Sequence, residues 1–278
     1  MTTLTRTASA VPSGRVATMQ RELNATFAIA LREVLRALKS PLSITFTIIF
    51  PILFIGVLGG SINQNLAGAL PFAYLPYMLI GMVANTMYQG TITGVTNLVE
   101  ERENDITAEL FVAPISRYAV LVGKMLGSGV AACVSLVGIV AMVFVMQIPM
   151  EAGDLLRVFA LAPILAVAGG ALGVFVIGLS QDPKVVALAV PLLIFPQTFL
   201  SGALIPVAAS SGVLGILAKI IPMTYSIDLA RNIFYAGKPE YAAAVLHPFA
   251  LDLVVTVAFC AAFILIGTFL FVRADRNR

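Results

Sequence analysis

From Ser40 to Val99 the chain contains no Asp, Glu, Lys or Arg, and from Met125 to Met150 it again contains none. Only 11% of the 278 residues are charged and 59% are hydrophobic, whereas a soluble domain carries about 25% charged residues. Uncharged stretches of this length can cross the roughly 30 Å hydrocarbon core of a bilayer. The apolar runs are continuous rather than alternating, which favours helices over barrel strands. The sequence therefore predicts an all-α polytopic membrane protein.

Six membrane spans are predicted, each about twenty residues long, within a single transmembrane domain at residues 20–278. Residues 1–19 are polar and have no apolar core, so they are expected to form a flexible cytoplasmic leader. The expected spans are residues 42–62, 72–98, 119–146, 156–180, 185–206 and 250–272.

The basic residues indicate how the spans are oriented, because cytoplasmic connections of membrane proteins are enriched in Lys and Arg. Most of the 17 Lys and Arg residues lie before the first predicted span, after the second, after the fourth or after the sixth. Both termini are therefore expected in the cytoplasm, together with the connection between spans two and three. The basic residues form no stripe interleaved with aromatics, so the net charge of +3 does not indicate nucleic-acid binding.

Two segments are predicted to lie at the membrane interface or to re-enter it rather than to cross it. Residues 20–39 have an amphipathic pattern, and Pro41 should end that helix before the first span. Residues 207–249 are too apolar for a solvated loop and too interrupted to span, so short re-entrant or interfacial helices are expected there. The hinges of this second segment would be Pro206 and Pro222. The apolar face of the first segment comprises Leu23, Phe27, Leu31, Val34, Leu35 and Leu38.

The connection after the second span is strongly acidic, with carboxylates at Glu100, Glu101, Glu103, Asp105 and Glu109. A solvated helix would explain this pattern, and so would a docking surface. The apolar Leu110, Phe111 and Val112 follow the acids in a loop that should face water, which favours docking. Acidic side chains suit the start of a short helix, which Pro114 would end before Ser116 caps the next helix.

The segment EERENDITAELFVAPISRYAVLVGKMLG resembles the type-2 ABC exporter permeases, and within them the daunorubicin-resistance-like branch. Its matching residues are Glu101, Arg102, Glu103, Glu109, Val112 through Arg117, Gly123 and Lys124. The segment FLSGALIPVAASSGVLGILAKIIPMTYSIDLARNI is similar to the same family at Ser201, Gly202, Pro206, Pro222, Thr224, Tyr225, Asp228 and Arg231. Asp105 stands where the family usually has Gly, and Ile221 where an Asn often precedes the second proline. The resemblance extends from about residue 20 to residue 272.

This resemblance implies that the acidic connection is a coupling helix, which docks on a separate ABC ATPase subunit and passes its closure on to the spans. Two ATPase copies would bind ATP and Mg²⁺ and would work with two permease copies, either a homodimer or a pair with a sister permease. The expected location is a prokaryotic inner or plasma membrane. The residues assigned to the ATPase contact are Glu101, Arg102, Glu103, Glu109, Leu110, Phe111, Pro114 and Arg117.

The chain has no P-loop of its own, because YAVLVGKM places Tyr118 and Met125 where Gly and Ser or Thr are required. The nucleotide must therefore bind to another polypeptide. No cofactor, catalytic residue or metal ligand is expected on this chain.

Polar residues inside the spans are candidates for a translocation path. Span two carries Asn85, Gln89, Thr93 and Thr96 on one helical face. Amides in lipid need partners, so this face should contact protein or a water-filled path, either as structural glue or as part of the route. The resemblance places the route near spans two and five, so the candidate path residues are Asn85, Gln89, Thr93, Gln197, Thr198 and Ser201.

The second family-like segment supplies a candidate external gate, which could instead be only a stabilising cap. Asp228 and Arg231 are spaced for an ion pair on one helix. In span four, the spacing of Gly169 and Gly173 predicts close helix packing. The candidate gate residues are Gly202, Pro206, Pro222, Tyr225, Asp228 and Arg231.

The leading interpretation is the permease subunit of an ATP-driven exporter of an amphipathic substrate, either a hydrophobic drug or a lipid-like molecule. Polysaccharide export and ion-coupled secondary transport are the alternatives, although ion coupling usually needs ionisable groups near the bilayer middle. The charged residues here lie in connections or at span ends. A membrane enzyme is disfavoured, because the chain has one histidine, His247, and no H-E-x-x-H motif. Cys133 and Cys260 are expected to be free thiols.

Overall fold

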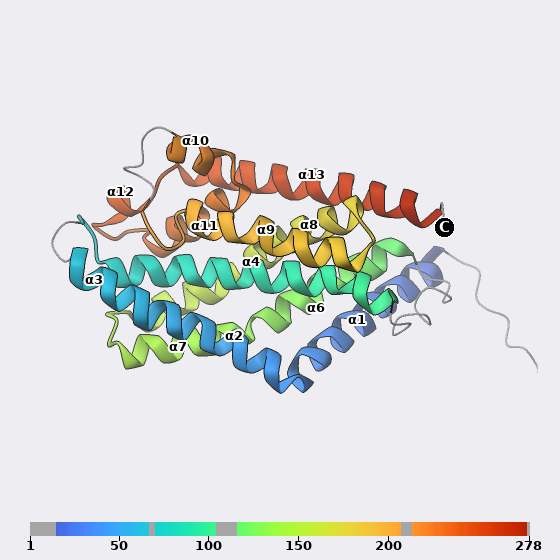
Figure 1. Ribbon diagram of the computed structural model, residues 1–278, viewed down its shortest axis with the longest axis horizontal. Helices are drawn as coiled ribbons and strands as arrows, with labels where there is room; N and C mark the ends of the chain where they lie inside the picture. Colours follow the sequence, from blue (N-terminus) through green and yellow to red (C-terminus); the bar gives the residue numbers. More distant parts are fainter. Residues whose placement is uncertain (1–14, 67–69, 104–115, 207–212, 277–278) are drawn as a thin grey trace, which may run out of the picture.

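The computed structural model describes residues 15–66, 70–103, 116–206 and 213–276. Every regular element in these ranges is a helix, and the long helices lie side by side in an elongated bundle (Figure 1). This confirms the all-α class that the uncharged stretches predict. The start of α1 and the end of α13 lie at the same end of the bundle (Figure 1).

Each of the six predicted spans overlaps helices of the structure, and the helix of the fifth span ends at Leu200, before the predicted end at residue 206. Span one corresponds to α2, the π-helical turn η1 and α3, and span three corresponds to α6 and α7. Spans two, four, five and six are α4, α8, α9 and α13. The bounds are α1 Arg15–Lys39, α2 Pro41–Leu53, η1 Phe54–Gly59, α3 Gly60–Leu66, α4 Tyr74–Glu103, α6 Arg117–Ala132, α7 Val134–Val145, α8 Ala152–Leu179, α9 Pro183–Leu200, α10 Val213–Ile220, α11 Pro222–Phe234, α12 Tyr241–Ala244 and α13 Phe249–Arg276.

Hydropathy separates α4 from the other long helices. In the described part of the chain, the stretches long and apolar enough to cross a membrane are Ile44–Asn65, Arg117–Val145, Phe159–Leu179, Pro183–Leu200 and Tyr241–Ala274. The 30 residues of α4 extend for about 45 Å at 1.5 Å per residue, which is ample length for a span. Its composition is more polar than that of the other long helices. Several of its polar side chains, such as Asn85, Thr91 and Thr96, are buried against neighbouring helices.

The central helix of the bundle is α4, which packs against α6, α8, α9 and α11. Its close approach to α8 depends on glycine. A Cβ at Gly169 would lie 2.3 Å from the carbonyl oxygen of Tyr88, and a Cβ at Gly173 would lie 2.9 Å from the Cβ of Val95. Since neither contact could be accommodated without a shift of the helices, the close packing predicted from this glycine spacing is confirmed.

The predicted amphipathic helix at residues 20–39 is confirmed as part of α1, which packs against α6. Two α6 glycines allow this contact. A Cβ at Gly123 would meet the carbonyl oxygen of Thr26 at 2.9 Å, and one at Gly127 would meet that of Ala30 at 2.6 Å. The apolar stripe points away from the bundle, with exposed side chains at Leu23, Phe27, Leu31, Leu35 and Leu38.

The first span is not a regular α-helix. Pro51 lies inside α2 and has no backbone N–H to donate to the helix. The π-helical turn η1 follows within a few residues and leads directly into α3. Of the five apolar stretches, Ile44–Asn65 and Tyr241–Ala274 are the least buried. The departure from regular geometry lies in the first of these two.

Short helices occupy the chain between α9 and α13, as the sequence predicts for residues 207–249. They gather at the end of the bundle opposite to the C-terminus (Figure 1). Pro222 stands in the first turn of α11, where its missing N–H removes no helical hydrogen bond. α11 packs against α4, α8 and α13, so this helix belongs to the core of that end.

We expect Gly169→Ala to destabilise the protein, because the added methyl group overlaps the α4 backbone. Forcing such an overlap typically costs about 1–3 kcal/mol. The matched control is Gly153→Ala on the same helix, where a Cβ would meet nothing within 4 Å. Size-exclusion profiles of heated, detergent-solubilised protein should give a lower melting temperature for Gly169→Ala only. Equal melting temperatures for the two variants would contradict the α4–α8 contact.

Candidate functional site

A buried ion cluster joins three helices beside the acidic connection. Lys124 on α6 is 2% exposed, and its Nζ donates to Glu101 Oε1 on α4 at 2.5 Å and to Glu33 Oε2 on α1 at 2.6 Å. Arg36 of α1 also pairs with Glu101, and Arg32 lies 3.9 Å from it. We call Glu33, Glu101, Lys124 and the two arginines the inner ion cluster.

The composition of the inner ion cluster explains why charged groups are tolerated there. A charge buried without a partner is strongly unfavourable, whereas a paired and hydrogen-bonded one can be accommodated. The ammonium of Lys124 lies between two carboxylates, and the partly exposed guanidiniums of Arg32 and Arg36 add positive charge from the side of α1. Loss of Glu33, Glu101 or Lys124 would leave a buried charge with too few partners.

The first helix also contacts the far side of the acidic connection. Glu22 of α1 accepts hydrogen bonds from the Ser116 backbone N–H at 3.0 Å and from its hydroxyl at 2.5 Å. Ser116 in turn accepts from the Ala119 N–H at 3.2 Å, which confirms it as the N-cap of α6. α1 therefore holds the residues before and after the connection at residues 104–115.

The residues predicted to contact an ATPase have different positions. Glu103 is exposed at the end of α4, and Arg102 donates to Gln181 Oε1 at 3.2 Å. Arg117 is half-buried in the first turn of α6. The residues of this group that lie outside the described ranges are Glu109, Leu110, Phe111 and Pro114.

Glu101, one of the residues assigned to the ATPase contact, lies inside the bundle. Its side chain is 1% exposed and is paired within the chain. Sequence reasoning also missed the roles of Glu33 and Lys124. The signal was present, since Lys124 falls in the first two turns of the predicted third span, and an ionisable residue within a span usually has a specific partner.

The polar residues of spans two and five meet in direct hydrogen bonds. Asn85 Nδ2 donates to Thr198 Oγ1 at 2.9 Å, and Gln89 Nε2 donates to the same oxygen at 3.1 Å and also to Asn85 Oδ1. Gln197 and Ser201 are buried beside them, and Gln197 Oε1 and Ser201 Oγ have no hydrogen-bond partner among the described residues. α4 and α9 are therefore joined by polar contacts at the positions that the sequence singles out.

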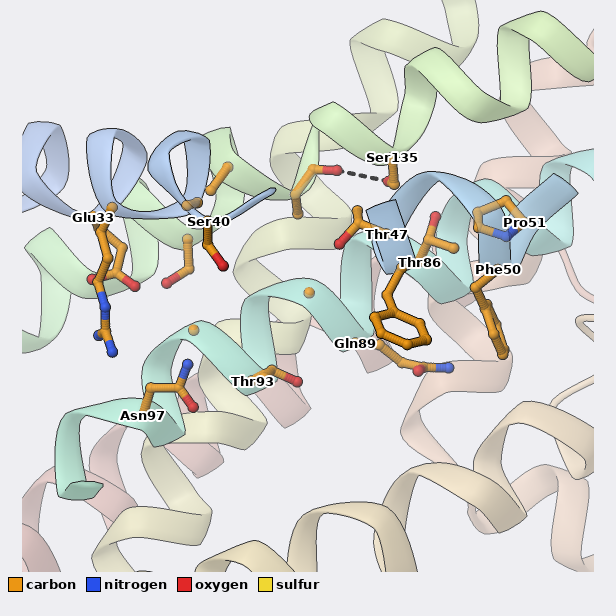
Figure 2. Close-up of a pocket in the computed structure, with 18 residues that line it drawn as sticks. Glu33, Ser40, Thr47, Phe50, Pro51, Thr86, Gln89, Thr93, Asn97 and Ser135 are labelled. Carbon is orange, nitrogen blue, oxygen red and sulfur yellow. Dashed lines mark hydrogen bonds between the residues drawn. The ribbon is translucent and has the colours of Figure 1, made fainter. Parts of the chain in front are cut away.

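Two hollows flank this polar face of α4. The first, of about 560 Å³, lies between α4 and the α1–α2 and α6–α7 pairs. Figure 2 shows Gln89, Thr93 and Asn97 following one another along α4, with Thr47 and Phe50 of α2 across the hollow. The second, of about 590 Å³, lies between α4 and α9. Thr93, predicted to line the path, is exposed and borders both hollows.

At the opposite end of α4, a buried arginine holds the region predicted to be a gate. Arg231 of α11 is 0% exposed, and its Nη2 donates to the Gly202 carbonyl oxygen at 2.6 Å. Its guanidinium carbon lies 3.5 Å from the centre of the Tyr77 ring, close enough for a cation–π contact. Gly202 has a φ of 84°, a left-handed conformation that favours glycine. Arg231 thus links α11, α4 and the end of α9.

The predicted ion pair between Asp228 and Arg231 is not formed. The Asp228 carboxylate instead accepts hydrogen bonds from the backbone N–H groups of Leu246, at 2.9 and 3.0 Å, and of His247, at 2.7 Å. The spacing of three residues allows a pair on one helix, but each side chain finds a more distant partner along the chain. Asp228 therefore anchors the segment before α13, and Arg231 anchors the segment after α9.

The other predicted gate residues lie around these two. Tyr225 donates its hydroxyl proton to the Lys219 carbonyl oxygen at 2.8 Å. Burial, and after it the nearby Asp252 carboxylate, raise the pKa of Tyr225, so this phenol remains a donor. Pro222 begins α11, and Pro206 is half-buried at the last described position before residues 207–212.

An elongated bundle of apolar helices, with polar hollows beside a central helix and an ion cluster next to an acidic connection, is the arrangement of a membrane permease. Residues 24–235 match the ABC-2 type transporter family, and the chain belongs to this family. It is thus a multi-pass membrane component of the ABC transporter class.

Two curated relatives are similar to part of the chain. The inner membrane transport permease YhhJ of Escherichia coli (strain K12) is 28% identical over 155 residues, and the protein of the same name in Shigella flexneri matches equally. The match covers 55% of this chain, which spans 41% of the length of these relatives. The similarity therefore concerns less than half of the length of each relative.

We expect Lys124→Met to destabilise the protein by about 3 kcal/mol, since the substitution leaves two carboxylates buried without their central cation. Lys184→Met is the control, because Lys184 is exposed on α9 and such surface substitutions usually change stability by less than about 0.5 kcal/mol. Adding Glu33→Gln to Lys124→Met should restore part of the loss. Thermal unfolding in detergent measures all three, and equal melting temperatures for the two Met variants would contradict a buried cluster.

Proposed function

We propose that this chain is the permease subunit of an ATP-driven exporter, in the daunorubicin-resistance-like branch of its family. A separate ATPase, in two copies, would bind ATP and Mg²⁺, and two permease copies would enclose the path. The substrate would be amphipathic, either a hydrophobic drug or a lipid-like molecule, moved out of the cytoplasm or the inner leaflet. The observation that carries this proposal is the inner ion cluster beside the acidic connection.

The cluster gives the acidic connection a mechanical link to the rest of the molecule. Residues 104–115 are bounded by Glu101 on one side and by Ser116 and Lys124 on the other, and α1 contacts all three through Glu22, Glu33 and Arg36. A force applied to the connection by a docked ATPase would therefore act on α1, α4 and α6 together. The exposed Glu100 and Glu103 at the end of α4 remain available for such a partner.

From this end, α4 would carry movement to the polar face. The same helix holds Glu101 near its last turn and Asn85 and Gln89 near its middle, where they bond to Thr198 of α9. A rotation or shift of α4 would alter these hydrogen bonds and the two hollows beside them. The expected translocation path would run along this face, between two permease copies.

The chemistry of the hollow between α4 and the α1–α2 and α6–α7 pairs supports an amphipathic substrate. Phe50 and Pro51 of α2 stand across from Gln89 and Asn97 of α4 (Figure 2), and Phe46 lines the same hollow. A site that combines aromatic surface with a few amide and hydroxyl groups suits a molecule with both apolar and polar parts. A polysaccharide would offer much less apolar surface, and ion coupling would need ionisable groups near the middle of α4.

Charge reversal at the exposed end of α4 tests the ATPase contact. We propose that these acids pair with basic groups on the ATPase, so Glu100→Lys/Glu103→Lys should weaken association with that subunit at least about tenfold, because like charges across an interface are strongly unfavourable. Co-purification and ATP hydrolysis in lipid nanodiscs measure the effect. Glu240→Lys, on the segment before α12 at the other end of the bundle, is the control and should leave both unchanged.

Glu101 is left intact in this experiment, so that a loss of binding cannot come from collapse of the inner ion cluster. Normal association and ATP hydrolysis in the double variant would reject the coupling role of these acids. Loss of association in the Glu240→Lys control as well would show that the effect is not local, and would reject it too.

Thr198→Val tests the α4–α9 contact as part of the path, because it removes the oxygen shared by Asn85 and Gln89 with little change of shape. We expect efflux of an amphipathic dye from cells to fall about tenfold, at unchanged binding of the ATPase. Thr45→Val is the matched control, since the Thr45 hydroxyl is exposed and bonds only to the Pro41 carbonyl oxygen of its own helix. Equal efflux in the two variants would contradict a role in transport.

A further inference from the structure

A cluster of three possible metal ligands lies where α11, α13 and the segment between them meet. Asp228 comes from α11, His247 from the segment before α13, and Asp252 from the first turn of α13. One ligand atom of each residue lies within 4.8 Å of the others. The sequence contains a single histidine, and no metal ligand was expected on this chain.

The separations fit the geometry of a small tetrahedral ion. His247 Nδ1 lies 3.3 Å from Asp228 Oδ2 and 3.4 Å from Asp252 Oδ1. Ligands bound about 2.0–2.1 Å from a tetrahedral Zn²⁺ are separated from one another by about 3.3 Å. Two of the three separations therefore already match, and the third is no more than 4.8 Å.

Two of the three atoms have no other partner. His247 Nδ1 and Asp252 Oδ1 are buried and form no hydrogen bond with any described residue. Asp252 is 0% exposed, and a carboxylate oxygen buried in this way is costly unless something satisfies it. Among the described residues, no Lys or Arg lies within 4.0 Å of Asp228 or Asp252, so the two carboxylates lack a cation of their own.

The surrounding contacts orient the three side chains. The Asp228 carboxylate is fixed by the N–H groups of Leu246 and His247, and Asp252 Oδ2 accepts from Asn232 Nδ2 at 2.8 Å. The imidazole of His247 stacks on Tyr225, with ring centres 5.3 Å apart. Hydrogen bonds that hold the ligands in place are typical of protein metal sites.

We propose that Asp228, His247 and Asp252 bind a divalent transition-metal ion, Zn²⁺, with one coordination position left for water. Imidazole nitrogen together with two carboxylates favours such an ion over Mg²⁺ or Ca²⁺, which take oxygen ligands and more of them. The His247 side chain is 23% exposed, which gives the ion a route from solvent. The bound ion clamps α11 to the start of α13 and neutralises the two buried carboxylates.

Metal titration of the full-length protein tests this site. The protein is purified in detergent with a tag that contains no histidine, treated with a chelator and titrated with Zn²⁺ by calorimetry. We expect one Zn²⁺ per chain and a higher melting temperature when it is bound. Asp252→Asn and His247→Gln should each weaken binding roughly a hundredfold or more and abolish the thermal shift. Asp154→Asn is the control, because Asp154 is a buried carboxylate that pairs with Lys238 outside the cluster.

A second measurement does not depend on the variants folding. Co²⁺ bound to the chelator-treated wild-type protein should give the intense visible absorption of a four-coordinate ion, and Zn²⁺ should displace it. Failure of the wild-type protein to bind Zn²⁺, or equal binding by all the variants, would overturn the proposal and leave His247 as a proton-bearing partner of the two aspartates. Weak, six-coordinate Co²⁺ absorption would overturn it as well.

Discussion

Lys124 is a cation in a stretch of chain that otherwise has no charge up to Met150, and its ammonium depends entirely on carboxylates brought by other helices. An unpaired ammonium at this depth would be strongly disfavoured, so α1 and α4 must both be in place before α6 can pack as observed. The contact thereby fixes α1 against the bundle and sets the separation of the two helices that bound the acidic connection. The glycines of α6 also determine how closely α1 packs, because a side chain at Gly123 or Gly127 would overlap the α1 backbone.

The fold class and the course of the helices could be predicted because they depend on local properties. Long uncharged stretches, the amphipathic period of residues 20–39 and the glycine spacing of α8 each act within one element. Partner choice could not be predicted in this way. The motifs that contain Glu101 and Asp228 indicate charged contacts but not which groups make them. In the structure, Glu101 pairs with Lys124, and Asp228 accepts hydrogen bonds from backbone N–H groups. Those partners are 18 or more residues away along the chain.

The polar contact between α4 and α9 was more accessible to sequence reasoning than the ion cluster. Amide and hydroxyl side chains at helical spacing on α4 had to find polar partners in an apolar setting, and α9 offered few of them. The structure satisfies Asn85 and Gln89 through one hydroxyl, that of Thr198. Lys124 and Glu33 were harder to connect, since nothing local to either residue shows that glycine-mediated packing brings α1 beside α6. Both examples show the same limit: a pattern reveals that a partner is needed, and only the packing reveals which one.

The π-helical turn at Phe54–Gly59 changes how the length of the first span should be counted. A π-helical turn holds one residue more than the α-helical turn it replaces, at little gain in length. Deleting a single residue there can return the segment to regular α-helix while α2 and α3 keep the faces they now present. Alignments of this segment among relatives should therefore tolerate a one-residue gap at this place, where elsewhere in a packed helix such a gap would rotate every following side chain by about 100°.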